Sequence, residues 1–220
     1  MDIVNNFNLV CENVNSVKKI NQSYNINIIV VTKTIIIDKI FPLINLNHYH
    51  FGENKVQEAK SKWLDIKKRN KNIKLHLIGR LQSNKVDEAC EVFDFIHSLD
   101  SKKLAIKIFE NEKKFNRNIS LFIQVNIGKE NQKSGIAIED TNKFLEFCKK
   151  DLKLNVIGLM CIPPFKENPN KYFKNLKDLA SKCNLNELSM GMSSDYKSAI
   201  EHGATFVRIG TAIFGERVSQ

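Results

Sequence analysis

Lys33 is a residue whose position in the sequence could support covalent chemistry. It follows the apolar run 28–31 and precedes a second apolar run at 35–37. Apolar surroundings lower the pKa of a lysine, and a neutral amine can attack a carbonyl carbon to form a Schiff base. A lysine at the end of a strand can also extend its ammonium group into water, so an ordinary solvated lysine is the alternative.

A second candidate is the segment LSMGMSSDYKSAIEHG at residues 188–203. A strand is predicted to turn at Gly191, after which Ser193 or Ser194 could cap a helix that carries Tyr196. Hydroxyl groups and free backbone amides at a helix N-terminus bind anions such as phosphate. The same pattern is typical of an ordinary helix cap, so both interpretations stay open.

The apolar run 204–209 is followed by a similar pattern. Gly210 and Thr211 supply backbone amides and a hydroxyl that could bind phosphate. Arg208 is one of only five arginines and stands inside the apolar run, where its guanidinium needs a ligand or a carboxylate as partner. Two such segments in succession favour a phosphate site if they follow the seventh and eighth strands of a barrel.

The histidines and cysteines do not form a metal-binding pattern. His48 and His50 are predicted to share one face of a strand, but no suitably spaced cysteine or acidic residue accompanies them, so a structural role is favoured. His76 could reach the mouth of the site or fill the core. The five cysteines include no CxxC pair, which argues against zinc or a disulfide framework and favours a reducing cytoplasm. Several other residues are interpreted as core: Cys161, Phe41, Phe93, Phe95 and Phe122.

Short apolar runs alternate along the chain with longer segments of helical spacing. Helical stripes are visible within 56–66, 104–115 and 176–183, and a helix-like segment at 7–20 precedes the first strand. Eight runs have the length and the β-branched content of strands. They are Asn25–Thr32, His48–Phe51, Lys74–Ile78, Phe93–Ser98, Ser120–Asn126, Leu154–Met160, Glu187–Gly191 and Ala204–Ile209.

Eight strands alternating with helices in 220 residues predict an α/β fold, a single (β/α)8 TIM barrel formed by residues 1–220. An open doubly wound sheet with fewer strands is the alternative. In a barrel the functional residues lie where strands end. The barrel therefore predicts that Lys33 and the segments after residues 191 and 208 meet at one face.

The overall composition limits the classes of function. The formal net charge is +10, which is compatible with RNA binding. Nearly all the basic residues are lysine, and Lys, Asn and Ile are abundant together, so we interpret most of the charge as compositional bias on solvated faces. No apolar run is long enough to span a membrane, and no secretory signal is visible at the N-terminus.

Several motifs together make the chain resemble the pyridoxal phosphate homeostasis proteins, which are similar to the barrel domain of alanine racemase standing alone. The resemblance covers about residues 25 to 217, and one departure is Arg80, where IGPLQSNK commonly has proline. The matching segments are VVTKT, HFGENKVQEAKSKW, LHLIGRLQSNK, IHSLDS, QVNIGKENQKSGI, VIGLMCIPP and LSMGMSSDYKSAIEHGATFVRIGTAIFGER.

The resemblance implies a fold-type III barrel that binds pyridoxal 5'-phosphate (PLP). Lys33 would hold the cofactor as a Schiff base, and Arg208 would face the pyridine nitrogen, where a cation disfavours the pyridinium form. The phosphate would be bound by Ser193, Gly210 and Thr211. Two further residues are implied near the ring: Asn54 and Met192.

The resemblance also implies a role without established catalysis. Alanine racemase needs a C-terminal β domain and a catalytic tyrosine, neither of which is expected here. The chain would carry and buffer PLP, maintain PLP and amino-acid homeostasis, and hand the cofactor to apo forms of PLP-dependent enzymes. The alternative is a small PLP-dependent racemase or related α-proton-transfer enzyme. We expect a cytoplasmic monomer with no membrane or nucleic-acid partner.

Overall fold

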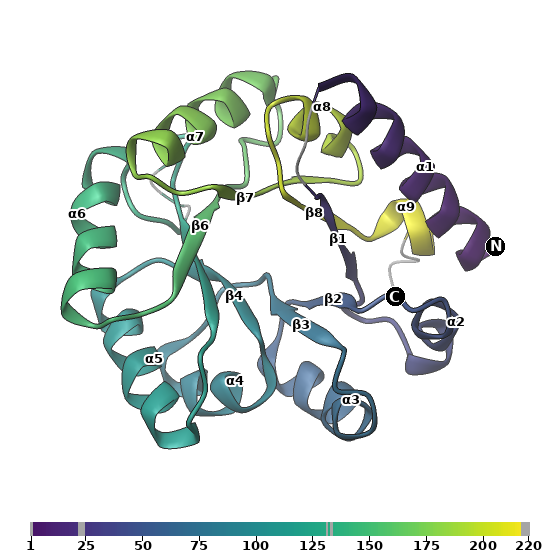
Figure 1. Cartoon of the computed structure of the whole chain (residues 1–220), viewed down its shortest axis with the longest axis horizontal. Helices are drawn as coiled ribbons and strands as arrows, with labels where there is room; N and C mark the ends of the chain where they lie inside the picture. The colour runs from purple at the N-terminus through teal and green to yellow at the C-terminus, as the bar shows by residue number, and fades with distance from the viewer. Residues whose placement is uncertain (1, 22–24, 131, 133, 217–220) are drawn as a thin grey trace.

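A computed structural model describes residues 2–21, 25–130, 132 and 134–216. The rest, including Arg217, lies outside the described residues. Eight parallel strands form a closed barrel in which each strand pairs with the next and β8 pairs with β1. Figure 1 shows the strands around the centre and the helices around the outside. The barrel confirms the predicted fold class and excludes the open sheet.

All eight predicted strands are present, with ends that differ from the sequence-based limits by up to two residues. The strands are β1 Asn27–Val31, β2 His50–Glu53, β3 Lys74–Leu77, β4 Phe95–Leu99, β5 Ser120–Gln124, β6 Val156–Met160, β7 Glu187–Met192 and β8 Phe206–Ile209.

The predicted helical stripes correspond to the longest helices, whose apolar faces cover the barrel. In α3, for example, Val56, Ala59 and Trp63 are buried at helical spacing. The helices are α1 Ile3–Asn21, α2 Phe41–Asn45, α3 Val56–Arg69, α4 Val86–Val92, α5 Lys102–Phe115, α6 Thr141–Glu146, α7 Asn170–Lys182, α8 Tyr196–Glu201 and α9 Thr211–Phe214, with a π-helical turn at Phe147–Asp151.

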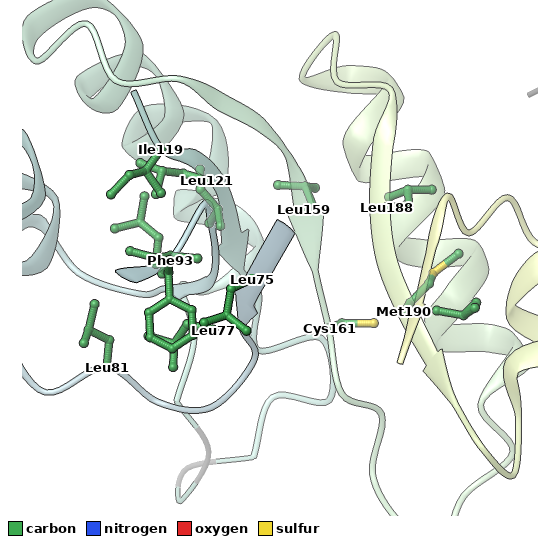
Figure 2. Close-up of a cluster of buried hydrophobic side chains, with 14 of the residues drawn as sticks. Leu75, Leu77, Leu81, Phe93, Ile119, Leu121, Leu159, Cys161, Leu188 and Met190 are labelled. Carbon is green, nitrogen blue, oxygen red and sulfur yellow. The ribbon is translucent and has the colours of Figure 1, made fainter. Parts of the chain in front are cut away.

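Side chains alternate between the two faces of the barrel wall. Leu75 and Leu77 of β3 lie in the core cluster between strands and helices, together with Phe93 (Figure 2). His76, between the two leucines, is fully buried and stacks on Phe95 of the next strand. Both faces of the wall are therefore buried, and for this reason the strands read as nearly continuous apolar runs.

The interior of the barrel is filled by a second, smaller cluster and by aromatic rings. Ile29, Phe122, Met160 and Phe206 come from four different strands and meet inside the wall. The core interpretation is confirmed for Phe93 and Phe122 and is wrong for Phe41, whose side chain is 43% exposed at the start of the short helix α2. An apolar residue type alone does not show which side of a short helix faces the barrel.

None of the described helices has the length and apolar character needed to span a bilayer. All five cysteines have free thiols, and four of them are buried. Burial raises the pKa of the Cys161 thiol to about 12, which agrees with its interpretation as a core residue.

Candidate functional site

A cavity of about 330 Å³ opens where β1, β7 and β8 end. Seven of its lining residues are those that the sequence analysis assigned to a cofactor site. They are Lys33, Asn54, Met192, Ser193, Arg208, Gly210 and Thr211. The remaining lining residues are Val31, Ile78, Ile162 and Ser194. The structure thus brings residues from positions 33 to 211 together around one cavity.

Lys33 is half-buried and lies between two residues whose backbones are held in place. Before it, the carbonyl of Thr32 accepts a hydrogen bond of 2.8 Å from Lys62 Nζ. After it, Thr34 adopts a left-handed backbone with φ 64°, and its amide donates to Glu58 Oε1 at 2.5 Å. A non-glycine residue adopts this conformation at a cost, so the hydrogen bond to Glu58 helps to fix the turn that presents Lys33.

Lys62 is the centre of this support. Its ammonium group donates to Glu53 Oε1 and to Glu58 Oε1, both at 2.9 Å. Partial burial raises the pKa of Glu58, but the hydrogen bonds from Lys62 and Thr34 outweigh this effect, so the pKa is lowered overall. The two carboxylates and the ammonium form a charged network beneath the turn after β1.

Glu53 is the deepest member of the network. Its carboxylate is completely buried at the end of β2, and its Oε1 also accepts from Thr32 Oγ1 at 2.7 Å and from Trp63 Nε1 at 2.9 Å. A buried carboxylate is stable only when charge partners and hydrogen-bond donors compensate the loss of water. Glu53 therefore ties β2, β1 and α3 together beside Lys33.

Arg208 forms part of the cavity wall and is only 5% exposed. Its guanidinium donates to the carbonyl of Ser189 at 2.8 Å, to Ser189 Oγ at 2.7 Å and to the carbonyl of Cys161 at 3.0 Å. Burial lowers the pKa of Arg208 from its ordinary value. Within the described chain no carboxylate forms an ion pair with it, so its charge favours an electron-rich ligand atom in the cavity.

Ser193 lies at the junction between the loops that follow β7 and β8. Its Oγ accepts hydrogen bonds from the amides of Gly210 and Ala212, at 3.2 and 3.3 Å. The predicted cap by Ser193 or Ser194 is wrong, because α8 begins at Tyr196. The backbone turn instead closes through a 2.6 Å hydrogen bond from the amide of Met192 to Asp195 Oδ1, and the Ser193 hydroxyl bonds to the segment after β8.

Asn54 and Met192 lie at the edge of the cavity. Asn54 follows β2, and the backbone of Gly79 approaches it so closely that a Cβ at Gly79 would lie 2.3 Å from the Asn54 carbonyl oxygen. Met192 is 37% exposed at the rim. Arg80 is exposed and lines three neighbouring cavities, two of which it shares with Asn54.

Three features of the site were not predicted from the sequence. Ile78 and Ile162 give the cavity apolar walls, and the Glu53–Lys62 network supports Lys33 from below. The VQEAKSKW segment contained a partial signal, because Lys62 falls one helical turn after Glu58.

The predicted shared strand face of His48 and His50 is wrong, because β2 begins at His50: the His48 ring packs against Phe7 of α1, whereas the His50 ring packs against His76. His76 fills the barrel interior and does not reach the mouth of the cavity. In the parts of the chain that the structure covers, no group of three or more histidine, cysteine or acidic residues could hold a metal ion.

The fold and the site define a (β/α)8-barrel protein with an amine, a buried guanidinium and converging amide donors around one cavity at the C-terminal ends of its strands. Residues 8–218 match the family model described as alanine racemase, N-terminal domain. The chain is 40% identical over 195 residues to the pyridoxal phosphate homeostasis protein of Aquifex aeolicus, covering 84% of this chain and 85% of the relative. The chain belongs to this family.

Solved structures agree with this placement. PipY of Synechococcus elongatus, solved without PLP, superimposes with a TM-score of 0.84 and 32% identity over 93% of this chain and 99% of PipY. PipY with PLP bound superimposes with a TM-score of 0.79. An alanine racemase of Clostridium difficile shares the fold alone, with a TM-score of 0.72 and 14% identity over 94% of this chain and 56% of the racemase.

Proposed function

We propose that this protein binds pyridoxal 5'-phosphate in the cavity around Lys33 and acts as a carrier that buffers the cofactor and helps to maintain amino-acid homeostasis. The observation that carries the proposal is the meeting of Lys33, Arg208 and the Ser193–Gly210 junction around one cavity. These groups match the three parts of PLP: an aldehyde, a ring nitrogen and a phosphate. The relatives' names and the PLP-bound PipY structure support the same ligand.

The residues present fit this cofactor. The amides of Gly210 and Ala212 already converge on one oxygen atom, that of Ser193, which is the arrangement that a phosphate oxygen requires. Thr211, which lines the same cavity, adds a hydroxyl. The walls formed by Val31, Ile78 and Ile162 suit the flat face of a heteroaromatic ring.

Lys33 would attach the cofactor reversibly, and Arg208 would donate to the ring nitrogen. Bound PLP supplies an aldehyde for Schiff-base formation and a ring that can accept electrons. A guanidinium beside the ring nitrogen favours the unprotonated pyridine, which is the weaker electron acceptor. Storage needs the reversible attachment and does not need the strong electron sink.

The carrier role is favoured over a racemase by the groups that line the cavity. Racemisation at a carbon atom requires proton transfer on two faces. Lys33 is one candidate base, and the described lining residues include no tyrosine, histidine, cysteine or carboxylate as a second. We further propose that the recipients are apo forms of PLP-dependent enzymes and that the protein acts in the cytoplasm as a monomer.

The test is to trace the attachment of the cofactor. Purified protein incubated with PLP should show the visible absorbance of a Schiff base, and borohydride reduction should fix the mass of the cofactor on the peptide that contains Lys33. Lys33→Ala should abolish that absorbance and retain the fold, because Lys33 lies at the open end of a strand. Lys197→Ala, a change of an exposed lysine on α8, is the matched control and should behave like the parent.

Two results would contradict the proposal. A label on Lys55, Lys85 or Lys197 would show that the cavity is not the binding site. Incubation with L-alanine and other amino acids in heavy water separates carrier from enzyme. Deuterium incorporation at Cα with turnover would establish the racemase-type alternative.

A further inference from the structure

A continuous row of hydrogen-bonding side chains crosses the barrel interior and ends at Arg208. His50, His76 and His97 come from the adjacent strands β2, β3 and β4. His50 Nδ1 lies 2.9 Å from His76 Nε2, and His76 Nδ1 lies 2.9 Å from His97 Nε2. His97 Nδ1 lies 2.8 Å from Ser189 Oγ, which accepts from Arg208. The row joins the first residue of β2 to the wall of the cavity.

Aromatic stacking fixes the planes of the two inner rings. His76 stacks on Phe95 with ring centroids 4.2 Å apart and planes 15° apart. His97 stacks on Phe122 at 4.3 Å and 13°. Both histidines are 0% exposed, so water does not compete for their nitrogens. Each ring is therefore held with both nitrogens directed along the row.

The burial of the two inner histidines favours their neutral form. Burial lowers the pKa of His76 and of His97 well below the ordinary value, and the positive charge of Arg208 lowers that of His97 further. A neutral imidazole has one N–H donor and one bare nitrogen acceptor. Each histidine can therefore donate in one direction of the row only.

Arg208 determines that direction. A guanidinium only donates, so one lone pair of Ser189 Oγ is used by Arg208. Within the described chain the only other hydrogen-bond partner of Ser189 Oγ is His97 Nδ1. The hydroxyl hydrogen is satisfied only if it is donated to His97 Nδ1, because the reversed order leaves it buried without an acceptor. His97 then carries its hydrogen on Nε2 and donates to His76, which likewise donates to His50.

We propose that His97 and His76 are positioning residues that act through Ser189 on Arg208. Their ordered hydrogens keep a Ser189 lone pair directed at the guanidinium and so hold Arg208 in the cavity wall. The order of the hydrogens is a property of the protein alone. Its effect on ligand binding rests on the proposed function, in which Arg208 faces the ring nitrogen of PLP.

The order can be measured on cofactor-free protein. Long-range proton–nitrogen correlation spectra of ¹⁵N-histidine-labelled protein at pH 8 distinguish the two neutral tautomers. His76 and His97 should both appear as fixed Nε2–H forms. His202 is an internal reference for the opposite tautomer, because its Nδ1 lies 2.8 Å from the Ser198 carbonyl oxygen and must donate to it. An Nδ1–H form, or an averaged signal, at either inner histidine would overturn the proposal.

Variants then test the action on Arg208. Ser189→Ala should release His97 from its fixed tautomer and raise the dissociation constant for PLP about tenfold, since a hydrogen bond to a charged group is lost. Ser98→Ala is the matched control: Ser98 is also a buried serine, next to His97 on β4, but its hydroxyl has no partner in the described structure. This control should leave the tautomer and the affinity unchanged.

His97 itself separates the positioning role from simple packing. His97→Asn keeps a side-chain oxygen as acceptor for Ser189 and should retain most of the affinity, whereas His97→Leu should lose it about as far as Ser189→Ala does. If Ser189→Ala binds PLP as tightly as the parent, the proposal is wrong. If the parent does not bind PLP at all, the proposed function fails, and the tautomer spectra still decide whether the hydrogens are ordered.

Discussion

Replacement of Lys62 by methionine tests the charged network beneath Lys33. Methionine has nearly the same length and volume as lysine but no charge, so the change removes the partner of Glu53 with little loss of packing. The side chains of Lys62 and Glu53 are 11% and 0% exposed. Thr32 Oγ1 and Trp63 Nε1 would remain as donors to the carboxylate, but neither carries a charge.

The expected loss follows from this burial. Breaking a buried ion pair from one side destabilises a protein by about 3–5 kcal/mol, because the other charge is left uncompensated. Urea unfolding of Lys62→Met should therefore show that decrease in the free energy of unfolding. For a chain of this size about 2–4 °C of melting temperature is lost per kcal/mol, so the midpoint should fall by roughly 6–20 °C.

Two further variants identify the cause. Glu53→Gln combined with Lys62→Met removes both charges and should recover a large part of the stability. Lys68→Met is the matched control on the same helix, because Lys68 pairs with Asp65 where both side chains are exposed, at 66% and 81%. A loss in Lys62→Met no larger than that in Lys68→Met would refute the reasoning.

Three other changes should have measurable effects. Acid should destabilise the protein: burial lowers the pKa of His48 to about 4 and those of His76 and His97 well below 6.5. Because the unfolded chain binds protons that the folded chain does not, stability is full above the unfolded-state pKa and falls as pH decreases. The slope approaches about 4 kcal/mol per pH unit between about pH 6 and pH 4, where folded His48 also begins to bind a proton. Urea unfolding at several pH values would show a flat profile over this range if these histidines titrate normally when folded. Ser193→Ala and Thr211→Val should each weaken PLP binding about tenfold, because each removes a hydrogen bond to the phosphate. If fluorescence titrations give the parental dissociation constant for both variants, the phosphate lies elsewhere. Gly79→Ala would put a Cβ 2.3 Å from the Asn54 carbonyl oxygen. The variant should therefore lose about 1–3 kcal/mol of stability, and Asn54 should be displaced from the cavity. A variant with the melting temperature and PLP affinity of the parent would contradict this.

The sequence was sufficient to predict the barrel because its strands are buried on both faces. The run Ile28–Val31 is apolar at every position, and eight mostly apolar runs alternate with segments of helical spacing. Short helices such as α2 and α4 were not predicted, because five to seven residues contain too few turns to show a helical period. Their positions depend on the neighbouring strands and helices.

The residues that line the cavity could be predicted from the sequence, but the contacts that hold them in place could not. Lys33, Arg208 and Thr211 each follow or end an apolar strand, and the rule that barrel sites form at strand ends brings them together. Contacts such as those of Ser193 with Gly210, and of Glu53 with Lys62, depend on side-chain directions that only the folded chain determines. The predicted helix cap by Ser193 was wrong for the same reason.

Lys33 and Arg208, the two basic residues that line the cavity, are supported in opposite ways. Lys33 stands on the turn after β1, which is held by charged groups of α3, among them Lys62 and Glu58. Arg208 is held by neutral acceptors inside the barrel, including Ser189 Oγ. Neutral acceptors suit Arg208, because a further positive charge beside it would add repulsion to the cost of burying the guanidinium. Charged groups suit the turn at Lys33, because a left-handed backbone needs strong hydrogen bonds to hold it. Both residues are thus positioned by the protein itself. Less conformational entropy is then lost when a ligand binds, so the affinity depends mainly on the direct contacts with the ligand.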